Sequence, residues 1–223
     1  PGLVGAAPIQ NIGAYGVELS DVFHSLKGWD RINRCWKTLQ RNDCQFGYRD
    51  SVFKRALKDR FVVTEVTLKL SLEPTVNFKY AVLSEYLMGR GISQPSPLEV
   101  AEAVIAIRSA KLPDPALLAN AGSFFKNPLV SPLAFESLIQ QYPTMPYYPS
   151  DNGLVKLAAG WLLENAGWKG AQQGDLAMHT QQALVLVNHG NATGEDVIMF
   201  AKAIKQDINE KFSVMLEIEP RVY

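Results

Sequence analysis

The sequence predicts an α+β fold, in which strands and helices occupy separate stretches of the chain. Residues 60–72 alternate apolar and polar side chains and are rich in β-branched residues, a pattern typical of a half-buried strand. The segment Ser96-Pro-Leu-Glu99 combines an N-cap serine, a proline at the first helical position and a glutamate at the third, and predicts a helix to about Ala110. Thr193-Gly-Glu-Asp196 predicts another helix start. Segregated strands and helices of this kind favour α+β.

The composition is ordinary for a globular chain that buries a core. The 223 residues are 47% hydrophobic and 20% charged, and the length allows one large domain or two smaller ones. Lys+Arg and Asp+Glu number 22 each, which gives no case for nucleic acid or an anionic membrane as a partner. Cys35 and Cys44 lack a Cys/His cluster, so we expect reduced thiols and no metal site. No apolar run reaches membrane-spanning length, and we expect a cytoplasmic monomer.

The N-terminal stretch is rich in glycine, with four between Gly2 and Gly16. Glycine lets the backbone approach a ligand closely, so this stretch could cradle phosphates or a flat ring. A glycine-rich turn without a ligand explains the composition equally well. The spacing is not that of a dinucleotide-binding fingerprint. Strands are expected between Val17 and Arg41.

Arg49 lies in the segment Phe46-Gly-Tyr-Arg-Asp-Ser51. Its guanidinium could be held in place and aimed at a carboxylate, or it could form a surface ion pair. The following stretch, Asn77 to Gly91, is expected to be a mobile connection, in which Tyr80 is either a hydrogen-bond donor or a packing residue.

The segment Asn120–Pro128 is predicted to be a shaped loop rather than core. Lys111-Leu-Pro-Asp-Pro115 precedes it and is expected to separate two parts of the fold. The loop places the Ser123 hydroxyl directly after Gly122, then two aromatic residues, then Lys126 and Asn127. Either a catalytic loop or a surface turn with incidental polar groups fits this pattern.

The remaining chain predicts three more helices and two strands. Ser131-Pro132 opens a helix that ends before Pro143, and residues 143–152 are expected to be a loop. A helix over 154–165 is followed by a strand over 183–188. The Thr193 helix is expected to run to about Ile208, with Val197, Phe200, Ala201 and Ile204 on one face. A final strand over 212–219 would place Glu217 and Glu219 on the side opposite Leu216.

Five of these segments, taken together and in order, resemble one family, the flavoprotein UDP-N-acetylenolpyruvoylglucosamine reductases of bacterial cell-wall synthesis. They are residues 1–16, 46–51, 111–115, 121–128 and 216–221. The resemblance extends over nearly the whole chain, and Tyr80 in a long connection resembles the family's type with a tyrosine-bearing loop. It implies that NADPH reduces a bound FAD, and that the flavin then gives hydride to the enolpyruvyl group of a UDP-sugar.

The resemblance also implies roles for particular residues. Ser123 would donate a proton to the substrate, and Arg49 and Glu219 would stabilise the enol-like intermediate and orient the substrate carboxylate. The implied substrate and phosphate contacts are Tyr80, Lys111, Asn127 and Gln182. The implied flavin contacts lie in one loop: Ile9, Gln10, Asn11, Gly13, Ala14 and Tyr15. For Lys111 and Lys126 a solvated cation is the alternative, and for Gln182 a cap at the start of a strand.

The implied domain organisation is the remainder of a two-lobed FAD-binding domain, residues 1–110 with a closing strand 212–223, plus an α+β substrate-binding domain, residues 113–210. We expect an N-terminal flavin lobe to be missing, and a chain without it not to bind FAD normally. The alternatives are a non-catalytic sugar-nucleotide-binding module and, more remotely, a flavin oxidase with the same fold.

Overall fold

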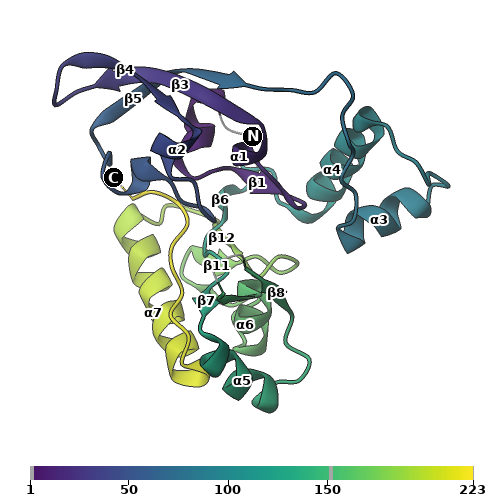
Figure 1. Ribbon diagram of the computed structural model, residues 1–223. Coiled ribbons are helices and arrows are strands. Elements are labelled where there is room, and N and C mark those ends of the chain that lie inside the picture. The colour runs from purple at the N-terminus through teal and green to yellow at the C-terminus, as the bar shows by residue number, and fades with distance from the viewer. Residues whose placement is uncertain (1–2, 151–152, 223) are drawn as a thin grey trace. The chain divides into compact units, whose positions relative to one another are not determined.

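The computed structural model describes residues 3–150 and 153–222 of the chain. The chain divides into two compact units, residues Pro1–Ile107 (unit 1) and Arg108–Tyr223 (unit 2) (Figure 1). The division falls inside a helix just before the Lys111–Pro115 segment that the sequence marked as a boundary. Each unit has its own hydrophobic core, and each is described by itself.

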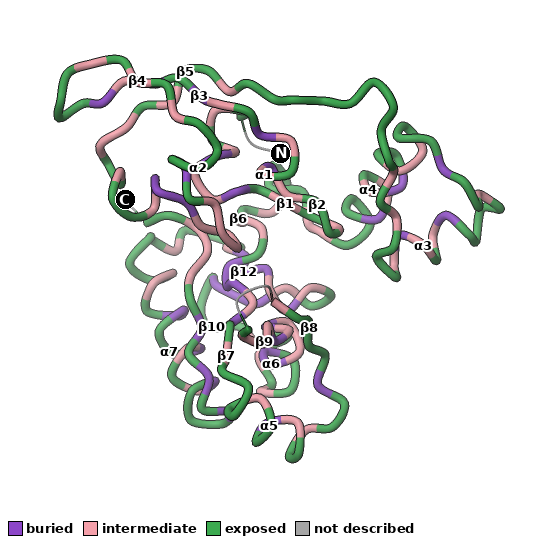
Figure 2. The backbone as a smooth tube through the Cα atoms, viewed as in Figure 1, coloured by how far each residue is buried: buried purple, intermediate pink, exposed green. Residues whose placement is uncertain are grey.

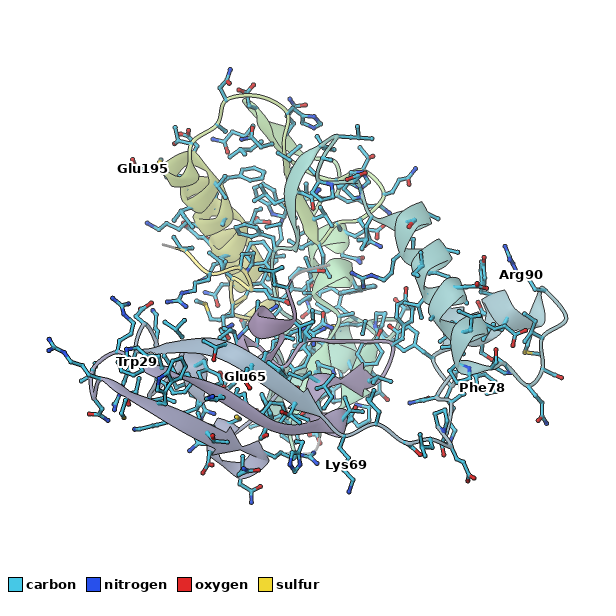
Figure 3. The ribbon with its side chains drawn as sticks, turned by 90° about the horizontal axis from the view of Figure 1, so that it is seen from above. Trp29, Glu65, Lys69, Phe78, Arg90 and Glu195 are labelled. Atoms are coloured by element: carbon cyan, nitrogen blue, oxygen red, sulfur yellow. The ribbon has the colours of Figure 1, made fainter. Side chains whose placement is uncertain are left out.

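Unit 1 contains a three-stranded antiparallel sheet in the order β4-β3-β5. Its strands are β3 (Phe23–Asp30), β4 (Cys35–Gln40) and β5 (Phe61–Leu68), which confirms the strands expected in 17–41 and 60–72. One face covers a small core to which β3 contributes Phe23 and Leu26. The other face carries Trp29 and Trp36, whose ring centroids are 5.4 Å apart, and Glu65 (Figure 3 labels Trp29 and Glu65).

Short elements join this sheet to the rest of unit 1. They are η1 (Val4–Ile9), β1 (Gly13–Ala14), β2 (Val17–Glu18), α1 (Leu19–Val22), α2 (Arg41–Cys44) and η2 (Val52–Lys54). Strands β1 and β2 form a hairpin whose two turn residues, Tyr15 and Gly16, have φ values of 53° and 78°. Positive φ at both turn positions gives the twist that a two-residue hairpin requires.

A pair of helices completes unit 1: α3 (Ala81–Met88) and α4 (Pro97–Lys111), the second of which continues into unit 2. They share a cluster of buried residues, Leu83, Leu87, Ala103 and Ile107. The capping box of α4 is present, since the Ser96 N–H donates to Glu99 at 2.7 Å and the Glu99 N–H to Ser96 at 3.3 Å. Residues 77–91, which were expected to be a mobile connection, contain α3, because Leu83 and Leu87 are spaced to bury one face of a helix.

Unit 2 contains two antiparallel sheets. The larger has the order β10-β11-β12-β6, formed by Gln172–Gln173, Leu176–Met178, Val185–Asn188 and Ala119–Ser123. The smaller has the order β7-β9-β8, formed by Leu129–Val130, Val155–Leu157 and Tyr147–Pro149. The expected loop 143–152 therefore contains β8, and the helix expected from 154 begins only after β9. Each of β8 and β9 is three residues long, too short to show an alternating pattern in the sequence.

Three helices pack against these sheets around the core of unit 2: α5 (Pro132–Gln141), α6 (Ala159–Asn165) and α7 (Gly194–Phe212). The proline-marked start of α5 and the Thr193 cap of α7 are confirmed. Helix α7 is longer than expected, because Ile204, Ile208 and Phe212 follow one another at four-residue spacing and are all buried (Figure 2).

The segment after α7 is not the strand that the sequence predicted. Between Ser213 and Val222 its one bridge within the described residues joins Ile218 to Phe125. The alternation itself is confirmed, since Val214 and Leu216 are 2% exposed and Met215 is 64% exposed. Val214 and Leu216 pack in the core of unit 2.

No helix in the described part of the chain is both long enough and apolar enough to cross a membrane.

Candidate functional site

The loop that precedes the β1–β2 hairpin is fixed by Asn11, which is 1% exposed. Its amide nitrogen donates to the Glu18 carboxylate at 2.6 Å and to the Gly47 carbonyl at 3.1 Å, and its oxygen accepts from the Ser20 N–H at 2.9 Å. The Ser51 hydroxyl, also buried, donates to the Ile9 carbonyl at 2.6 Å. The side chains of Asn11 and Ser51 therefore join residues 9–20 to residues 47–51, and Asn11 orders the loop with its side chain.

Arg49 is held by the same hairpin. One guanidinium nitrogen donates to the Gly13 carbonyl at 2.6 Å, another lies 3.9 Å from a Glu18 carboxylate oxygen, and the group lies over the Tyr48 ring at 5.4 Å. The side chain is 20% exposed. Arg49 also has a φ of 52°, an uncommon backbone conformation for a residue with a side chain. Of the two readings of Arg49 in the sequence, these contacts favour a guanidinium whose position is fixed.

Tyr80 stands at the start of α3, where it is the N-cap residue and is 43% exposed. Its ring meets the Tyr15 ring edge to face, with centroids 5.3 Å apart. This contact joins the turn of the hairpin to the start of α3, so Tyr15, Tyr80 and Arg49 are connected to one hairpin of unit 1.

Ser123 lies at the end of β6, beside a β-bulge. Val185 pairs with Ser123 and Val187 with Asn120, so Ala121 and Gly122 together stand opposite one residue of β12. Gly122 has a φ of 72°, and its N–H is bonded to the Asn120 side-chain oxygen at 2.9 Å. A bulge of this kind changes the direction in which the next side chain points. Ser123 is exposed, although the residues after it are buried.

Glu219 is brought beside this bulge by its backbone. Its N–H donates to the carbonyl of Phe124, the residue after Ser123, at 2.9 Å. The Lys126 N–H donates to the Glu217 carbonyl at 2.9 Å, and Phe125 bridges Ile218. Two segments far apart in the sequence, 123–126 and 217–219, are thus neighbours in unit 2.

Asn127 and Gln182 lie in the surroundings of the same bulge. The Asn127 side-chain oxygen accepts the N–H of Ala159, the first residue of α6, at 3.0 Å, and so satisfies one of the free donors at that helix start. Gln182 is half-buried in the turn before β12, and its carbonyl accepts the Val185 N–H at 2.9 Å. Lys111 is exposed at the end of α4.

The prediction of a shaped loop over 120–128 was wrong for much of this segment. Residues 119–123 form β6, and Phe124 and Phe125 are 5% and 1% exposed in the core of unit 2. Lys126 is 8% exposed and forms an ion pair with Glu217, so it is not a solvated cation. No local sequence pattern indicates this pair, because its two members are 91 positions apart.

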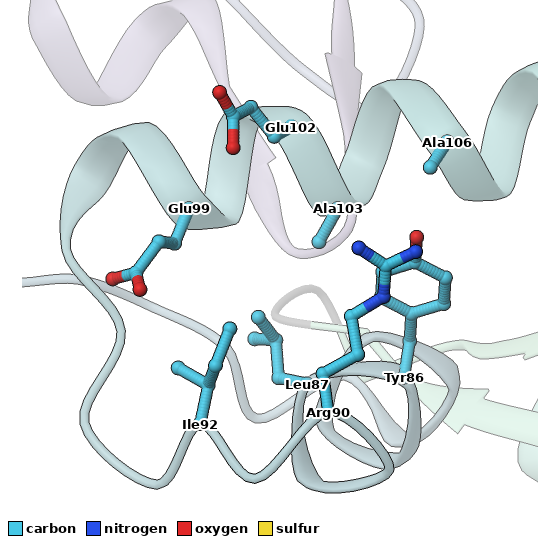
Figure 4. A pocket seen from close by; sticks show the side chains of 8 residues that line it. All are labelled: Tyr86, Leu87, Arg90, Ile92, Glu99, Glu102, Ala103 and Ala106. Atoms are coloured by element: carbon cyan, nitrogen blue, oxygen red, sulfur yellow. The ribbon is translucent and has the colours of Figure 1, made fainter.

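The thiol of Cys44, which is buried in the core of unit 1, is not a candidate nucleophile. Burial raises the pKa of the Cys44 thiol to about 12, which keeps it protonated at neutral pH. The described residues contain no group of three or more His, Cys, Asp or Glu side chains arranged to hold a metal ion. A pocket of about 270 Å³ between α3 and α4 has Arg90 over the Tyr86 ring at 4.6 Å, and Glu99 and Glu102 along one wall (Figure 4). None of the catalytic or binding residues predicted from the sequence lines this pocket.

Residues 114–223 match the family model described as UDP-N-acetylenolpyruvoylglucosamine reductase, C-terminal domain. The chain is 51% identical over 223 residues to the UDP-N-acetylenolpyruvoylglucosamine reductase of Pseudomonas syringae pv. syringae, and 49% identical over 223 residues to that of Pseudomonas aeruginosa. Each alignment covers 100% of this chain and 66% of the relative, so the chain spans just under two thirds of their length.

The fold is similar to the crystal structure of UDP-N-acetylenolpyruvylglucosamine reductase from Thermus caldophilus, with a TM-score of 0.61. The match covers 99% of this chain and 60% of that one, at 23% sequence identity.

Proposed function

Because the chain belongs to the family of UDP-N-acetylenolpyruvoylglucosamine reductases, we propose that it catalyses the reduction for which that family is named. The reaction uses NADPH and FAD to convert UDP-N-acetylglucosamine enolpyruvate to UDP-N-acetylmuramate. The observation that carries the proposal is the position of Ser123, an exposed hydroxyl beside a β-bulge, with the backbone of Glu219 bonded to the next residue. The proposed co-substrate and sugar nucleotide imply a cytoplasmic location, and we propose a monomer.

The hairpin of unit 1 is compatible with the flat ring of a flavin. Ile12 and Val17 are 47% and 45% exposed, and Ala14 between them is also exposed, so apolar and small residues are accessible there. Ile9, Gln10, Asn11, Gly13, Ala14 and Tyr15 would hold the cofactor. Of these, Asn11 and Gly13 also fix the loop itself, through the Asn11 side chain and the Gly13 carbonyl. When bound, FAD supplies the hydride that it has received from NADPH.

Ser123 would supply the proton in the second part of the reaction. Hydride addition at the vinyl methylene carbon breaks the π bond of the C=C group and leaves an electron pair on the adjacent carbon, conjugated to the carboxylate. The hydroxyl of Ser123 would give its proton to that carbon and so form the lactyl ether. A serine is a weak acid, but the acceptor is a strongly basic carbon and the proton travels only the length of a hydrogen bond. The exposure of Ser123 beside the bulge supports this role.

Arg49 and Glu219 would act on the charge that develops during the reaction. Negative charge moves toward the substrate carboxylate as the enol-like intermediate forms, and a guanidinium already held in place stabilises that charge without reorganising. The contacts of Arg49 with Gly13, Glu18 and Tyr48 support such a preset position. Glu219 would orient the carboxylate and polarise the reacting group.

Tyr80, Lys111, Asn127 and Gln182 would bind the substrate and the phosphates of NADPH. Tyr80 and Lys111 are exposed and carry a hydroxyl and a cation suited to a diphosphate. Asn127 uses its oxygen at the start of α6, so its amide N–H groups are the atoms that we assign to the substrate.

Replacement of Ser123 by alanine tests this assignment. We expect Ser123→Ala to slow oxidation of the reduced flavin by the enolpyruvyl substrate by about a hundredfold or more, because the proton donor is lost. Reduction of the flavin by NADPH should keep its rate, since no proton from Ser123 is needed there. Ser137→Ala is the matched control, an exposed serine on α5 whose hydroxyl bonds to Leu133 at 3.2 Å. Equal loss of both half-reactions in Ser123→Ala would contradict the role.

A further inference from the structure

Glu18 is an acidic residue of unit 1 that the sequence did not mark as functional. It ends β2 and pairs with Gly13 of β1 across the hairpin. Its N–H donates to the Asp21 carboxylate at 2.8 Å, which fixes its backbone at the start of α1. Its side chain is 34% exposed. The Glu18 carboxylate is therefore carried by a backbone held on both sides, and it lies partly out of water.

One oxygen of this carboxylate satisfies a buried donor in the proposed flavin loop. The Asn11 amide nitrogen donates to Oε2 of Glu18 at 2.6 Å, and Asn11 is 1% exposed. A buried donor that loses its acceptor costs stability. The Glu18 side chain also packs closely on the loop, since a Cβ on Gly13 would lie 2.8 Å from the Glu18 Cγ. The glycine at position 13 thus leaves room for Glu18.

The other oxygen of the carboxylate lies toward Arg49. Glu18 Oε1 is 3.9 Å from Nη1 of Arg49, while Nη2 of Arg49 donates to the Gly13 carbonyl at 2.6 Å. A separation of 3.9 Å is longer than a hydrogen bond, so Glu18 acts on Nη1 through its charge. One bond at Nη2 does not define how a planar guanidinium is turned, and a negative charge beside Nη1 supplies a second point. Because Asn11 holds the carboxylate by its other oxygen, that charge has a set position.

We propose that Glu18 is a positioning residue, which links the proposed flavin loop to the proposed carboxylate-stabilising arginine. Its carboxylate fixes Asn11 through a hydrogen bond and orients the Arg49 guanidinium through its charge. The inference rests on the proposed function, and it adds a residue that acts through Asn11 and Arg49 without touching the reacting atoms.

Glu18→Gln, made in the full-length flavin-loaded protein, removes the charge but keeps an amide oxygen that accepts the Asn11 N–H. We expect the limiting rate of flavin oxidation at saturating enolpyruvyl substrate to fall by about tenfold, because a displacement of about 1 Å can cost about a hundredfold. The half-saturating substrate concentration should change by less than about threefold, since the positive charge of Arg49 is kept. Flavin reduction by NADPH should stay within about twofold of the wild-type rate.

Asp50→Asn is the matched control for this variant. The Asp50 side chain is also 34% exposed, and it pairs with Arg55 at 3.1 Å. Its removal takes one partly exposed carboxylate from the same part of unit 1. Both half-reactions should stay within about twofold of wild type, since exposed ion pairs contribute little.

The double variant with Arg49→Lys shows whether Glu18 acts through Arg49. In a protein that already carries Arg49→Lys, Glu18→Gln should lower the oxidation rate by less than about twofold, because residues that act through one contact are not additive. A general weakening of the fold would instead appear in full in both backgrounds.

Glu18→Ala tests the link to the flavin loop. It removes the acceptor of the Asn11 amide as well as the charge, and we expect the dissociation constant of FAD to rise by about tenfold. Glu18→Gln should bind FAD as tightly as the wild type does. Tight FAD binding by Glu18→Ala would overturn the link between Glu18 and the flavin loop.

The role toward Arg49 is overturned by any of three results. They are a wild-type oxidation rate in Glu18→Gln, an equal loss of both half-reactions, and a full effect of Glu18→Gln in the Arg49→Lys background. If the wild-type flavin is not oxidised by the substrate at all, it is the proposed function that fails.

Discussion

Asn11, Ser51 and Lys126 are polar residues whose side chains join distant segments within their own unit. Asn11 bonds Glu18 and Gly47, Ser51 bonds Ile9, and Lys126 pairs with Glu217. Buried polar groups are stable only when partnered. The sequence identified Asn11 as a residue of a ligand loop, but not as the group that orders that loop. Its partners lie up to 36 positions away, and no local pattern indicates them.

Arg49 offers a test at the scale of one residue. Arg49→Lys keeps the positive charge but loses the planar fork that bonds the Gly13 carbonyl and lies over Tyr48. We expect kcat/KM for the enolpyruvyl substrate to fall by about tenfold or more, with KM for NADPH little changed. The control is Arg55→Lys, because Arg55 pairs with Asp50 at 3.1 Å with half of its side chain exposed (51%). Equal activity of the two variants would contradict a fixed guanidinium at Arg49.

Asp30 offers a test by pH. It is fully buried, and Arg60 donates to both of its oxygens at 3.0 and 2.8 Å. These bonds, with those from Asn33 and Lys37, hold the pKa of the carboxyl well below its ordinary value of 3.8. A lowered folded-state pKa stabilises the fold at pH values above the ordinary pKa, and this stabilisation is lost as the pH falls toward the folded-state pKa.

Asp30→Asn should therefore destabilise the protein strongly at pH 7, and the difference from wild type should shrink as the pH falls below about 4. Denaturant unfolding at a series of pH values measures this. Glu65→Gln removes an exposed pair with Lys27 (3.3 Å) and should cost at most about 1 kcal/mol at any pH. If the difference in the free energy of unfolding between the wild type and Asp30→Asn does not depend on pH, the ionised carboxylate of Asp30 is not the source of the stabilisation.

At the scale of elements, the sequence predicted best those that carry a local start signal. Helices α4, α5 and α7 each begin at a serine or threonine cap, and the structure confirms all three starts. Strands β8 and β9 were missed because they are short and depend on each other for hydrogen bonds. The segment after α7 has the alternation of a strand without its ladder, since a single bridge joins it to Phe125. A local sequence pattern does not indicate which distant segments pair with each other.

The cap of α7 gives a test of this local signal. Thr193 accepts the Asp196 N–H at 3.3 Å and donates its hydroxyl to the Asp196 carboxylate at 2.7 Å. Thr193→Ala should lower the free energy of unfolding by about 1 kcal/mol. Ser137→Ala, inside α5, should change it by less. Unfolding in denaturant distinguishes the two, and an equal loss in both would argue against the cap.

The β-bulge at Gly122 gives a test that separates backbone strain from function. Gly122 and Gly174 have φ values of 72° and 59°, and a Cβ built on either would meet no atom within 4 Å. Alanine at either position should therefore cost about 1 kcal/mol of stability through its backbone conformation alone. We expect Gly122→Ala, but not Gly174→Ala, to slow oxidation of the flavin by substrate, because only Gly122 directs Ser123. Equal effects of the two variants on that rate would contradict the role of the bulge.

At the scale of the molecule, the sequence predicted an α+β fold and two parts with a boundary near 111–115. The structure has two compact units that divide between Ile107 and Arg108. The five sequence motifs indicated a family, and relatives at 51% and 49% identity carry the name of that family. The roles of Ser123, Arg49 and Glu219 stay predictions. The sequence could not indicate that Val214 and Leu216 pack in the core of unit 2 or that Glu217 pairs with Lys126, because these contacts join residues far apart in the chain.

We propose that the protein transfers reducing equivalents from NADPH to an enolpyruvyl sugar nucleotide. A single-turnover experiment without oxygen tests it most directly: the flavin of the full-length protein is bleached with one equivalent of NADPH, and UDP-N-acetylglucosamine enolpyruvate is then added. We predict that the visible absorption of oxidised flavin returns in proportion to the substrate added, with formation of the lactyl ether. A flavin that stays bleached in the presence of substrate and is oxidised only when oxygen is admitted would contradict the account.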